Sequence, residues 1–480
     1  MDQTLLSWLA SLASLLILAL LIHLWQRPQR WGPQAASAAL VLLCLGGFHW
    51  IFISLHRYGE MHALIAGAAT GLLALYVAAY GLLAGWLIRR YQLGALAIAG
   101  LITLLEWLRG EIFTGFPWLN WGYQQIDSPL AGYASAGGVF AVVFVTALCA
   151  AWIAQWRALG LIGVAGLHLL GVFLSTLAHT SPTGQEIQVA LVQSAVPQQM
   201  KFDPQQRAGL EAVQLQMAQD ASQTGSALLV LPETAFIEPW AALSTQTRLS
   251  LRQISMASGS VIITGLPLQD PDGWRNSAIG LYPSAGLRLD GFEARYDKAH
   301  LVPFGEFIPW GFRWFVDLMR MPLGDFSRGL PVQAPMPVAD QRIGLNICFE
   351  DLFGEELIGP LDPRIPSDRQ PTILLNISNL AWFGNTIALP QHLAIARMRS
   401  LETGRPSLRA TNTGMTAAID HRGRVIDILE PMAPGILVTR VQGMTGQTPF
   451  SRVGNLPVVL LAAALLLLGL RIRSPAKLRS

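Results

Sequence analysis

Three residues in the second half of the chain have side chains that together form a nucleophilic set. Cys348 ends the apolar run GLNIC, Glu233 ends ALLVLPE, and Lys298 lies in ARYDKAHLVPFGE. A carboxylate can take the proton of a thiol, while a lysine ammonium group favours the thiolate and balances the charge of an oxyanion. If the three side chains converge, they predict covalent catalysis by the thiol.

Each of these residues also has an ordinary structural interpretation. A single cysteine on an apolar strand is more often an inert core residue. A glutamate after Leu-Pro can end a strand at the surface, and Lys298 beside Asp297 can form a solvated charge pair of little value. The other two cysteines, Cys44 and Cys149, lie in apolar runs, so the sequence predicts no disulfide partner for Cys348. Taken singly, the residues favour the structural interpretation.

The surrounding segments alternate between apolar runs and helical patterns. The predicted strands are 188–196, 227–233, 261–268, 344–348 and 372–378, and the predicted helices are 207–223, 244–257 and 392–402. This alternation predicts an α/β domain whose sheets are covered by helices. Active groups of such domains gather beyond the carboxyl ends of strands, where Glu233 and Cys348 lie.

The composition indicates that much of the chain contacts lipid. Of 480 residues, 52% are hydrophobic and only 13% are charged, which is atypical of a soluble enzyme. Apolar runs of about 20 residues predict seven membrane helices, at 5–24, 35–55, 61–88, 93–108, 131–153, 158–178 and 455–470. The expected organisation is a transmembrane domain at 1–180, a catalytic domain at 181–452, and a last helix with a basic tail at 453–480.

Basic residues follow alternate predicted helices. They are Arg27 and Arg30, Arg89 and Arg90, Arg157, and finally Arg471, Arg473, Lys477 and Arg479. The positive-inside rule places these loops in the cytoplasm, and therefore places the catalytic domain and the N-terminus on the opposite side. The start Met1-Asp2-Gln3 lacks the basic residues of a secretory signal peptide. Near the end of the fourth predicted helix, Glu106 and Arg109 are spaced to pair within one turn.

Composition also bears on partners and cofactors. The net charge is only +3, and the basic residues are spread over short loops, which disfavours nucleic acid as a partner. The nine histidines lack paired-ligand spacing, and no metal or other cofactor is expected.

The segment 304–326 is rich in apolar residues and poor in charge. Its large side chains are Phe307, Trp310, Phe312, Trp314, Phe315, Leu318 and Met319. This composition predicts a lid or arm that contacts lipid. An ordinary amphipathic core helix is an equally good interpretation.

Several long motifs, in order, resemble the apolipoprotein N-acyltransferases, a membrane branch of the nitrilase-like hydrolases. They are LPETA, YDKAHLVPFGEFIP, NICFED, NISNLAWFGNT and QHLAIARMRSLETGRPSLRATNTG, with LLEWLRGEIFTGFPWLNWGYQQID in the membrane part. The resemblance covers nearly the whole chain. It implies a multi-pass helical membrane domain joined to an α/β domain of the nitrilase-like αββα sandwich type.

The resemblance also implies site residues. Glu233, Lys298 and Cys348 match the catalytic triad of that family, with Glu306 and Glu350 as its supporting glutamates. Two aromatic residues, Phe349 and Phe202, stand where the family often has Tyr and Trp, and Leu380 stands where it has Asp. Contacts to substrate or a lid are expected from Phe202, Trp310, Trp382 and Asn379. The family has eight membrane helices against seven predicted here, and the alignment of LHRYGEM indicates that its first helix has no counterpart.

The implied reaction moves a fatty acyl chain from a phospholipid, commonly phosphatidylethanolamine, to the amino group of a diacylglyceryl-cysteine on an apolipoprotein. The implied location is the bacterial inner membrane, with the catalytic domain in the periplasm. One alternative is a membrane-anchored amidase or nitrilase that uses the same triad with water. A transporter is a weaker alternative, because the predicted helices carry few charges.

Overall fold

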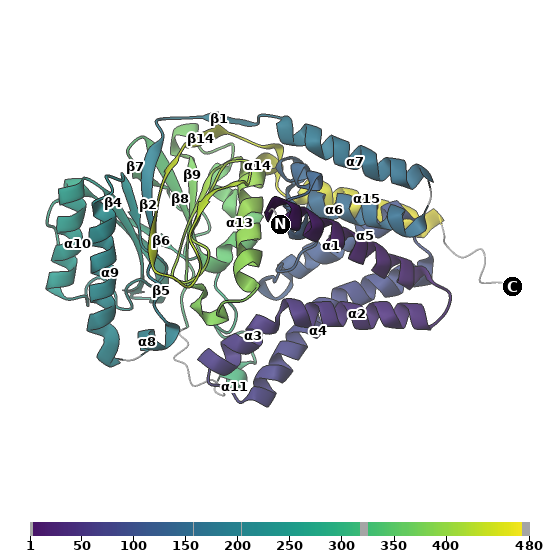
Figure 1. The fold of residues 1–480 in the computed structure, drawn as a ribbon, viewed down its shortest axis with the longest axis horizontal. Coiled ribbons are helices and arrows are strands. Elements are labelled where there is room, and N and C mark those ends of the chain that lie inside the picture. Colours follow the sequence, from purple (N-terminus) through teal and green to yellow (C-terminus); the bar gives the residue numbers. More distant parts are fainter. Residues whose placement is uncertain (1–2, 157, 203, 317–324, 473–480) are drawn as a thin grey trace.

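The computed structural model describes residues 3–156, 158–202, 204–316 and 325–472, which form two adjoining regions (Figure 1). Helices from both ends of the chain form one region, and the middle of the chain forms two stacked sheets with helices over their outer faces. Arg157, Leu318, Met319, Arg473, Lys477 and Arg479 lie outside the described residues, as do the side chains of Phe202 and Phe315.

Helices occupy each of the seven ranges predicted for membrane helices. They are α1 (Gln3–Gln26), α2 (Trp31–Gly47) continued by α3 (His49–Ile53) and the π-helical turn Ser54–Tyr58, α4 (Ala63–Tyr91), α5 (Ala95–Glu111), α6 (Ala134–Gln155), α7 (Ala158–Thr176) and α15 (Leu456–Ile472). Four described helical segments are long and apolar enough to cross a membrane, and a fifth qualifies if α2 and its 47° bent continuation form one span. Because α5 and α15 have only 17 residues each, the count of seven spans stays a prediction.

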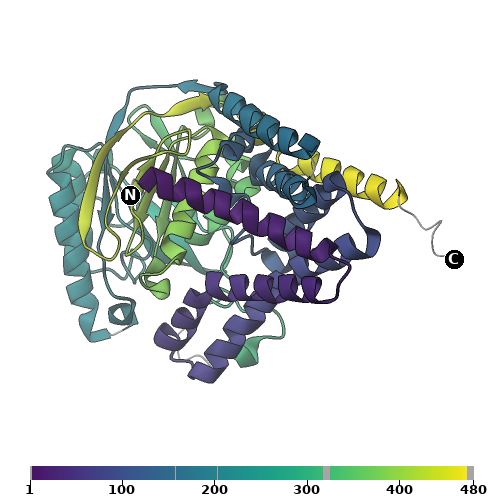
Figure 2. The same cartoon turned by 45° about the vertical axis from the view of Figure 1, so that its right-hand side comes forward.

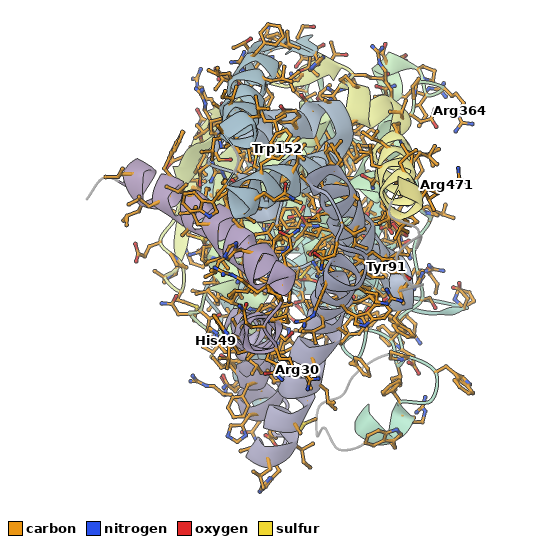
Figure 3. The ribbon with its side chains drawn as sticks, turned by 90° about the vertical axis from the view of Figure 1, so that its right-hand side faces the viewer. Arg30, His49, Tyr91, Trp152, Arg364 and Arg471 are labelled. Atoms are coloured by element: carbon orange, nitrogen blue, oxygen red, sulfur yellow. The ribbon has the colours of Figure 1, made fainter. Side chains whose placement is uncertain are left out.

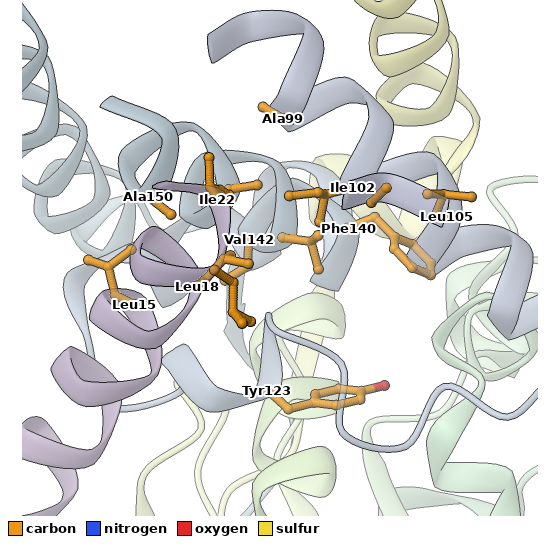
Figure 4. Packing of buried hydrophobic residues seen from close by; sticks show 14 of the residues in the cluster. Leu15, Leu18, Ile22, Ala99, Ile102, Leu105, Tyr123, Phe140, Val142 and Ala150 are labelled. Carbon is orange, nitrogen blue, oxygen red and sulfur yellow. The ribbon is translucent and has the colours of Figure 1, made fainter. Parts of the chain in front are cut away.

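The centre of the helical region is apolar on all sides. Leu18 and Ile22 of α1 meet Ile102 of α5 and Val142 of α6, and all four are almost completely buried (Figure 4). Helices α5 and α15 approach closely at Gly100, where an added Cβ would lie 2.4 Å from the carbonyl oxygen of Ala462. Small residues at such crossings allow helices to associate without a hydrophobic drive from water.

The pairing expected between Glu106 and Arg109 is confirmed. The Arg109 guanidinium bonds the Glu106 carboxylate and also donates to the carbonyl oxygens of Phe116 (2.6 Å) and Trp118 (2.7 Å). Arg109 is 1% exposed, so this pair fixes the loop that follows α5 instead of facing solvent.

The helices that carry basic residues at one end point those ends away from the sheets. Turning the molecule shows α1 and α15 extending in the same direction (Figure 2). The end facing the viewer in Figure 3 carries the labels of Arg30, directly before α2, Tyr91, the last residue of α4, and Arg471, near the end of α15. These three positions therefore lie at the end of the helical region that is remote from the sheets.

The sheet region contains two six-stranded sheets. The first has the order β13 (Gly435–Val441), β2 (Ile187–Gln193), β3 (Leu228–Val230), β4 (Val261–Asp270), β5 (Gly273–Leu281) and β6 (Ala294–Asp297). The second has the order β12 (Val425–Ile428), β11 (Ala417–Ile419), β10 (Ser407–Thr411), β9 (Ile373–Ser378), β8 (Gln341–Ile347) and β7 (Met336–Val338). A short pair, β1 (Thr180–Pro182) and β14 (Met444–Gly446), lies beside them.

The two sheets stack face to face and are covered on both outer faces by helices. Val189 and Val230 of the first sheet meet Leu345 and Ile377 of the second in one buried cluster. Helices α9 (Arg207–Ser222) and α10 (Thr245–Ser258) cover the first sheet, and α13 (Ala388–Thr403) lies between the second sheet and the membrane helices. The expected αββα sandwich beside a helical region is therefore confirmed.

Candidate active site

Cys348 occupies a strained turn at the carboxyl end of β8. Its φ of +54° lies in the left-handed region, which is uncommon for a residue with a side chain. The chain passes directly from β8 into a 3₁₀ turn, Cys348–Leu352. The carbonyl oxygen of Cys348 accepts hydrogen bonds from Asn376 Nδ2 and from the His392 ring, both at 3.2 Å. Side chains of the neighbouring strand and of α13 thus hold the turn that presents the thiol.

Glu233 follows β3 and is held by donors from two other strands. Its Oε1 accepts from Asn276 Nδ2 at 2.8 Å, and its Oε2 accepts from the backbone N–H of Asn379 at 2.8 Å. The side chain is nearly buried, with 6% of the residue exposed. A buried carboxylate fixed at both oxygens is oriented before any substrate arrives.

Lys298 and Glu306 form a buried pair next to Glu233. Lys298 Nζ lies 2.8 Å from Glu306 Oε1 and 3.5 Å from Glu233 Oε1. Asn276 Nδ2 also donates to Glu306 Oε1, at 2.7 Å, so one amide bridges the two carboxylates. Lys298 itself is 1% exposed. A buried charge at this depth requires such partners.

The charges of this cluster act on the thiol. Burial raises the pKa of Cys348 above its ordinary value, and Glu233 adds to the rise, whereas Lys298 and the backbone N–H of Asn379 favour the thiolate. For Lys298, burial disfavours the ammonium form, but the carboxylates of Glu306 and Glu233 outweigh it and raise the pKa. At neutral pH the resting thiol is therefore protonated and the Lys298 side chain is an ammonium group.

Glu350 holds the two active segments together. Its Oε1 accepts from the N–H groups of Ala299 (2.7 Å) and His300 (3.1 Å), which follow Lys298. Its Oε2 accepts from the N–H of Ile347 (2.6 Å), just before Cys348, and from the Tyr296 hydroxyl (2.9 Å). Burial raises the pKa of Glu350 to about 7 despite these donors. One carboxylate thus fixes the Lys298 segment against the Cys348 turn.

Arg409, Asp351 and His392 form a second buried group, which contacts the Cys348 turn. Arg409 bonds the Asp351 carboxylate, and its other amino group lies 2.7 Å from His392 Nδ1. His392 is fully buried, and burial together with Arg409 lowers its pKa well below the ordinary value. A neutral imidazole can accept from Arg409 and donate to the carbonyl oxygen of Cys348.

Comparison with known proteins gives matches over both regions. The family model for the apolipoprotein N-acyltransferase N-terminal domain matches residues 4–152, and the carbon-nitrogen hydrolase model matches residues 188–450. The apolipoprotein N-acyltransferase of Ralstonia nicotianae is 46% identical over 442 residues, covering 87% of this chain and 82% of its own. The chain belongs to the apolipoprotein N-acyltransferase family. The family resemblance expected from the motifs is therefore confirmed.

A second relative gives a match of similar length. The apolipoprotein N-acyltransferase of Nitrosomonas europaea is 38% identical over 469 residues, covering 94% of this chain and 91% of its own. Among solved structures, an amidase from Nesterenkonia sp. is 22% identical, with a TM-score of 0.38, and the match covers 54% of this chain and 92% of that chain.

The residues expected to contact substrate or a lid lie in different settings. Trp310 is 98% exposed, near α11 (Arg313–Val316), and Trp382 lies in a 3₁₀ turn with its ring edge-on to Tyr58. The Asn379 side chain, by contrast, donates to Gln198 Oε1 and accepts from Asn412 Nδ2, while its N–H serves Glu233. Phe202 ends α8 (Gln198–Phe202).

Phe349, which the motif resemblance aligns with a position where the family often has Tyr, is buried. Its ring lies 5.2 Å from Phe353 and 5.7 Å from His300, centroid to centroid. The aromatic contacts expected of this position are present without a hydroxyl.

Among the described residues, no group of three or more His, Cys, Asp or Glu side chains is arranged to hold a metal ion.

Sequence reasoning missed two groups of this site. Asn276 bridges Glu233 and Glu306 from β5, and it lies among the polar residues Arg275 and Ser277, so its position in the sequence gave no signal. The Asn379 backbone N–H carries no sequence signal, because every residue except proline has one.

Proposed function

We propose that this protein transfers a fatty acyl chain from a membrane phospholipid to the free amino group of a diacylglyceryl-cysteine at an apolipoprotein N-terminus. The observation that carries the proposal is the buried cluster of Glu233, Lys298 and Glu306 within electrostatic reach of the Cys348 thiol, in a chain of the apolipoprotein N-acyltransferase family. The proposed donor is phosphatidylethanolamine, and Glu233, Lys298 and Cys348 are the proposed catalytic residues.

In the first half-reaction, Glu233 takes the proton of the Cys348 thiol as sulfur attacks the carbonyl carbon of the donor ester. A C–S bond forms and negative charge develops on the carbonyl oxygen. Lys298 and the backbone N–H groups after Cys348 stabilise that charge. The ester C–O bond then breaks, Glu233 returns its proton to the leaving oxygen, and a lysophospholipid departs from the thioester enzyme.

In the second half-reaction, the neutral amine of the acceptor attacks the thioester carbonyl carbon. Glu233 removes a proton from the attacking nitrogen as the C–N bond forms. The C–S bond breaks, the proton passes to the thiolate, and the cysteine is regenerated. The buried position of Lys298, 1% exposed, keeps its charge unscreened by water through both half-reactions.

The membrane arrangement supports this substrate class. Both donor and acceptor have hydrocarbon chains that keep them in the bilayer, so the site has to lie at its surface. We propose that residues 1–180 and 453–480 form the membrane part and that residues 181–452 face the periplasm, with the apolipoprotein as partner on that side. The exposed aromatic residues Trp310 (98%) and Trp314 (62%) favour a lipid-contacting arm over a core helix.

The test is the intact mass of the full-length protein after incubation with phosphatidylethanolamine. The wild type is expected to gain one fatty acyl chain and release lysophosphatidylethanolamine. A diacylglyceryl peptide with a free amine should then discharge the adduct, whereas the same peptide with an acetylated amine should not.

The matched control is Cys348→Ala, which keeps the surrounding contacts and lacks the nucleophile. No adduct on the wild type, with lipid bound to the protein, would overturn the proposal. Rapid loss of the adduct to water without the peptide would favour the alternative of an amide-hydrolysing enzyme.

A further inference from the structure

A cavity of about 280 Å³ lies at the junction of the membrane helices and the catalytic domain. The ends of α5 and α6 form one wall, and the segment after Cys348, α13 and Asn455 form the other. Among the described residues that line it, none belongs to the Glu233, Lys298 and Cys348 cluster. The cavity is large enough for a small polar group with several hydrogen-bond partners.

The lining carries more negative than positive charge. Four glutamates face it, Glu111, Glu355, Glu356 and Glu402, against the single guanidinium of Arg399. Arg399 is already paired with Glu402, at 3.1 Å. The remaining carboxylates are exposed at the mouth, so the cavity favours a cationic group.

Two buried acceptor atoms point to the same chemistry. His300 Nδ1 lies 2.8 Å from Glu356 Oε1, and in the tautomer that donates to this carboxylate the Nε2 atom is an acceptor. Asn455 donates from Nδ2 to Glu355 at 2.8 Å, which leaves Oδ1 as an acceptor. Neither atom has a hydrogen-bond partner in the described part of the chain, although both residues are only 7% exposed. Acceptors beside carboxylates match a group with several N–H donors.

Exposed apolar residues lie next to two of the lining residues in the sequence. Ile112 (40% exposed) and Phe113 (81%) follow Glu111, and Val453 (54%) and Leu456 (61%) flank Asn455. A ligand that uses both features has an ammonium head and hydrocarbon chains. We propose that this cavity binds the primary ammonium headgroup of an aminophospholipid, at a site separate from the catalytic cluster.

His300 connects this cavity to the Lys298 and Cys348 segments. The His300 ring stacks on Phe353 with a centroid distance of 3.6 Å, and its backbone N–H bonds Glu350 Oε1. Glu350 in turn fixes the residue before Cys348. A bound ammonium group that donates to His300 Nε2 therefore stabilises the arrangement of the Lys298 and Cys348 segments.

The test counts lipids retained by the full-length Cys348→Ala protein in native mass spectrometry, with phosphatidylethanolamine and phosphatidylcholine of identical chains offered together. The quaternary choline has no N–H donor, so it serves as the matched lipid. Adding Glu111→Gln and Glu355→Gln to this protein is expected to weaken binding of phosphatidylethanolamine at the cavity about tenfold. The number of phosphatidylethanolamine molecules retained per protein should then fall by one. Glu186→Gln, an exposed glutamate away from the cavity, should change nothing.

Equal retention of phosphatidylethanolamine by the parent and the double variant would overturn the inference. If the double variant fails to fold, photocrosslinking of a diazirine-labelled phosphatidylethanolamine to the wild type decides: label at 110–114 or 353–356 supports the site, and label confined elsewhere refutes it. Binding of the headgroup in this cavity does not require Cys348 to be a nucleophile. A negative result for headgroup binding is therefore distinguishable from a negative result for acyl transfer, which the Cys348 adduct measures.

Discussion

Replacing Glu306 with glutamine removes the nearest charge partner of Lys298. The two groups lie 2.8 Å apart and the Lys298 side chain is 1% exposed. At an effective dielectric constant of about 20, unit charges at that separation interact by about 6 kcal/mol. Breaking a buried pair by removing one partner typically costs about 3–5 kcal/mol. The ammonium group is then expected to move toward Glu233, its second contact at 3.5 Å.

That movement pairs Glu233 more tightly with the ammonium group and leaves it less available to accept the thiol proton. Thioester formation is expected to fall by about 100-fold, which corresponds to about 2.7 kcal/mol of transition-state stabilisation. The assay is the single-turnover rate of acyl adduct formation on Cys348, read by intact mass. Glu306→Asp, which keeps the charge, should lose less activity. Acylation of Glu306→Gln at the wild-type rate, in a protein with unchanged stability, would refute the reasoning.

Three further perturbations address the thiol, a second lysine and the arm. Alkylation of Cys348 by iodoacetamide should keep accelerating above pH 9, because burial raises the pKa of its thiol; a plateau below pH 8, seen by peptide mass mapping, would contradict this. Burial lowers the pKa of Lys201, which donates to Thr234, from 10.5 to about 8, so the unfolded chain binds more protons between these values. The free energy of unfolding should therefore rise by about 3 kcal/mol across that range in the wild type and not in Lys201→Met, measured by denaturant titration. Trp310→Ala should change the free energy of unfolding by less than about 0.5 kcal/mol, because the side chain is 98% exposed, yet slow acylation from phosphatidylethanolamine nanodiscs several-fold.

The strands and their functional ends were predictable from local pattern. The apolar runs end at Glu233 and Cys348, each at the carboxyl end of a strand with a parallel neighbour in its own sheet, and the stacking of the two sheets brings these ends together. The structure has β3 and β8 where the pattern predicted them, although β3 is only Leu228–Val230. Antiparallel partners such as β5 were not predicted, because their pairing depends on the other strands of the sheet.

The details that orient the site could not be read from residue types. The positive φ of Cys348 and the donation from the Asn379 backbone depend on the path of the main chain. Glu350 was identified only through a family motif, with no task assigned to it. Its four donors come from two segments 50 residues apart, and only the folded chain brings them together.

The two ends of the apolar arm meet at Glu306, the charge partner of Lys298. The segment that carries Trp310 begins at Glu306, and on its return the N–H of Phe326 donates to the carbonyl oxygen of Glu306 at 2.8 Å. Near the start of the arm, Phe304 and Ile308 pack against Met61, just before α4. The same residue that closes the arm through its backbone holds Lys298 through its side chain. Glu306 therefore contacts the returning end of the arm through its carbonyl oxygen and the Lys298 ammonium group through its carboxylate.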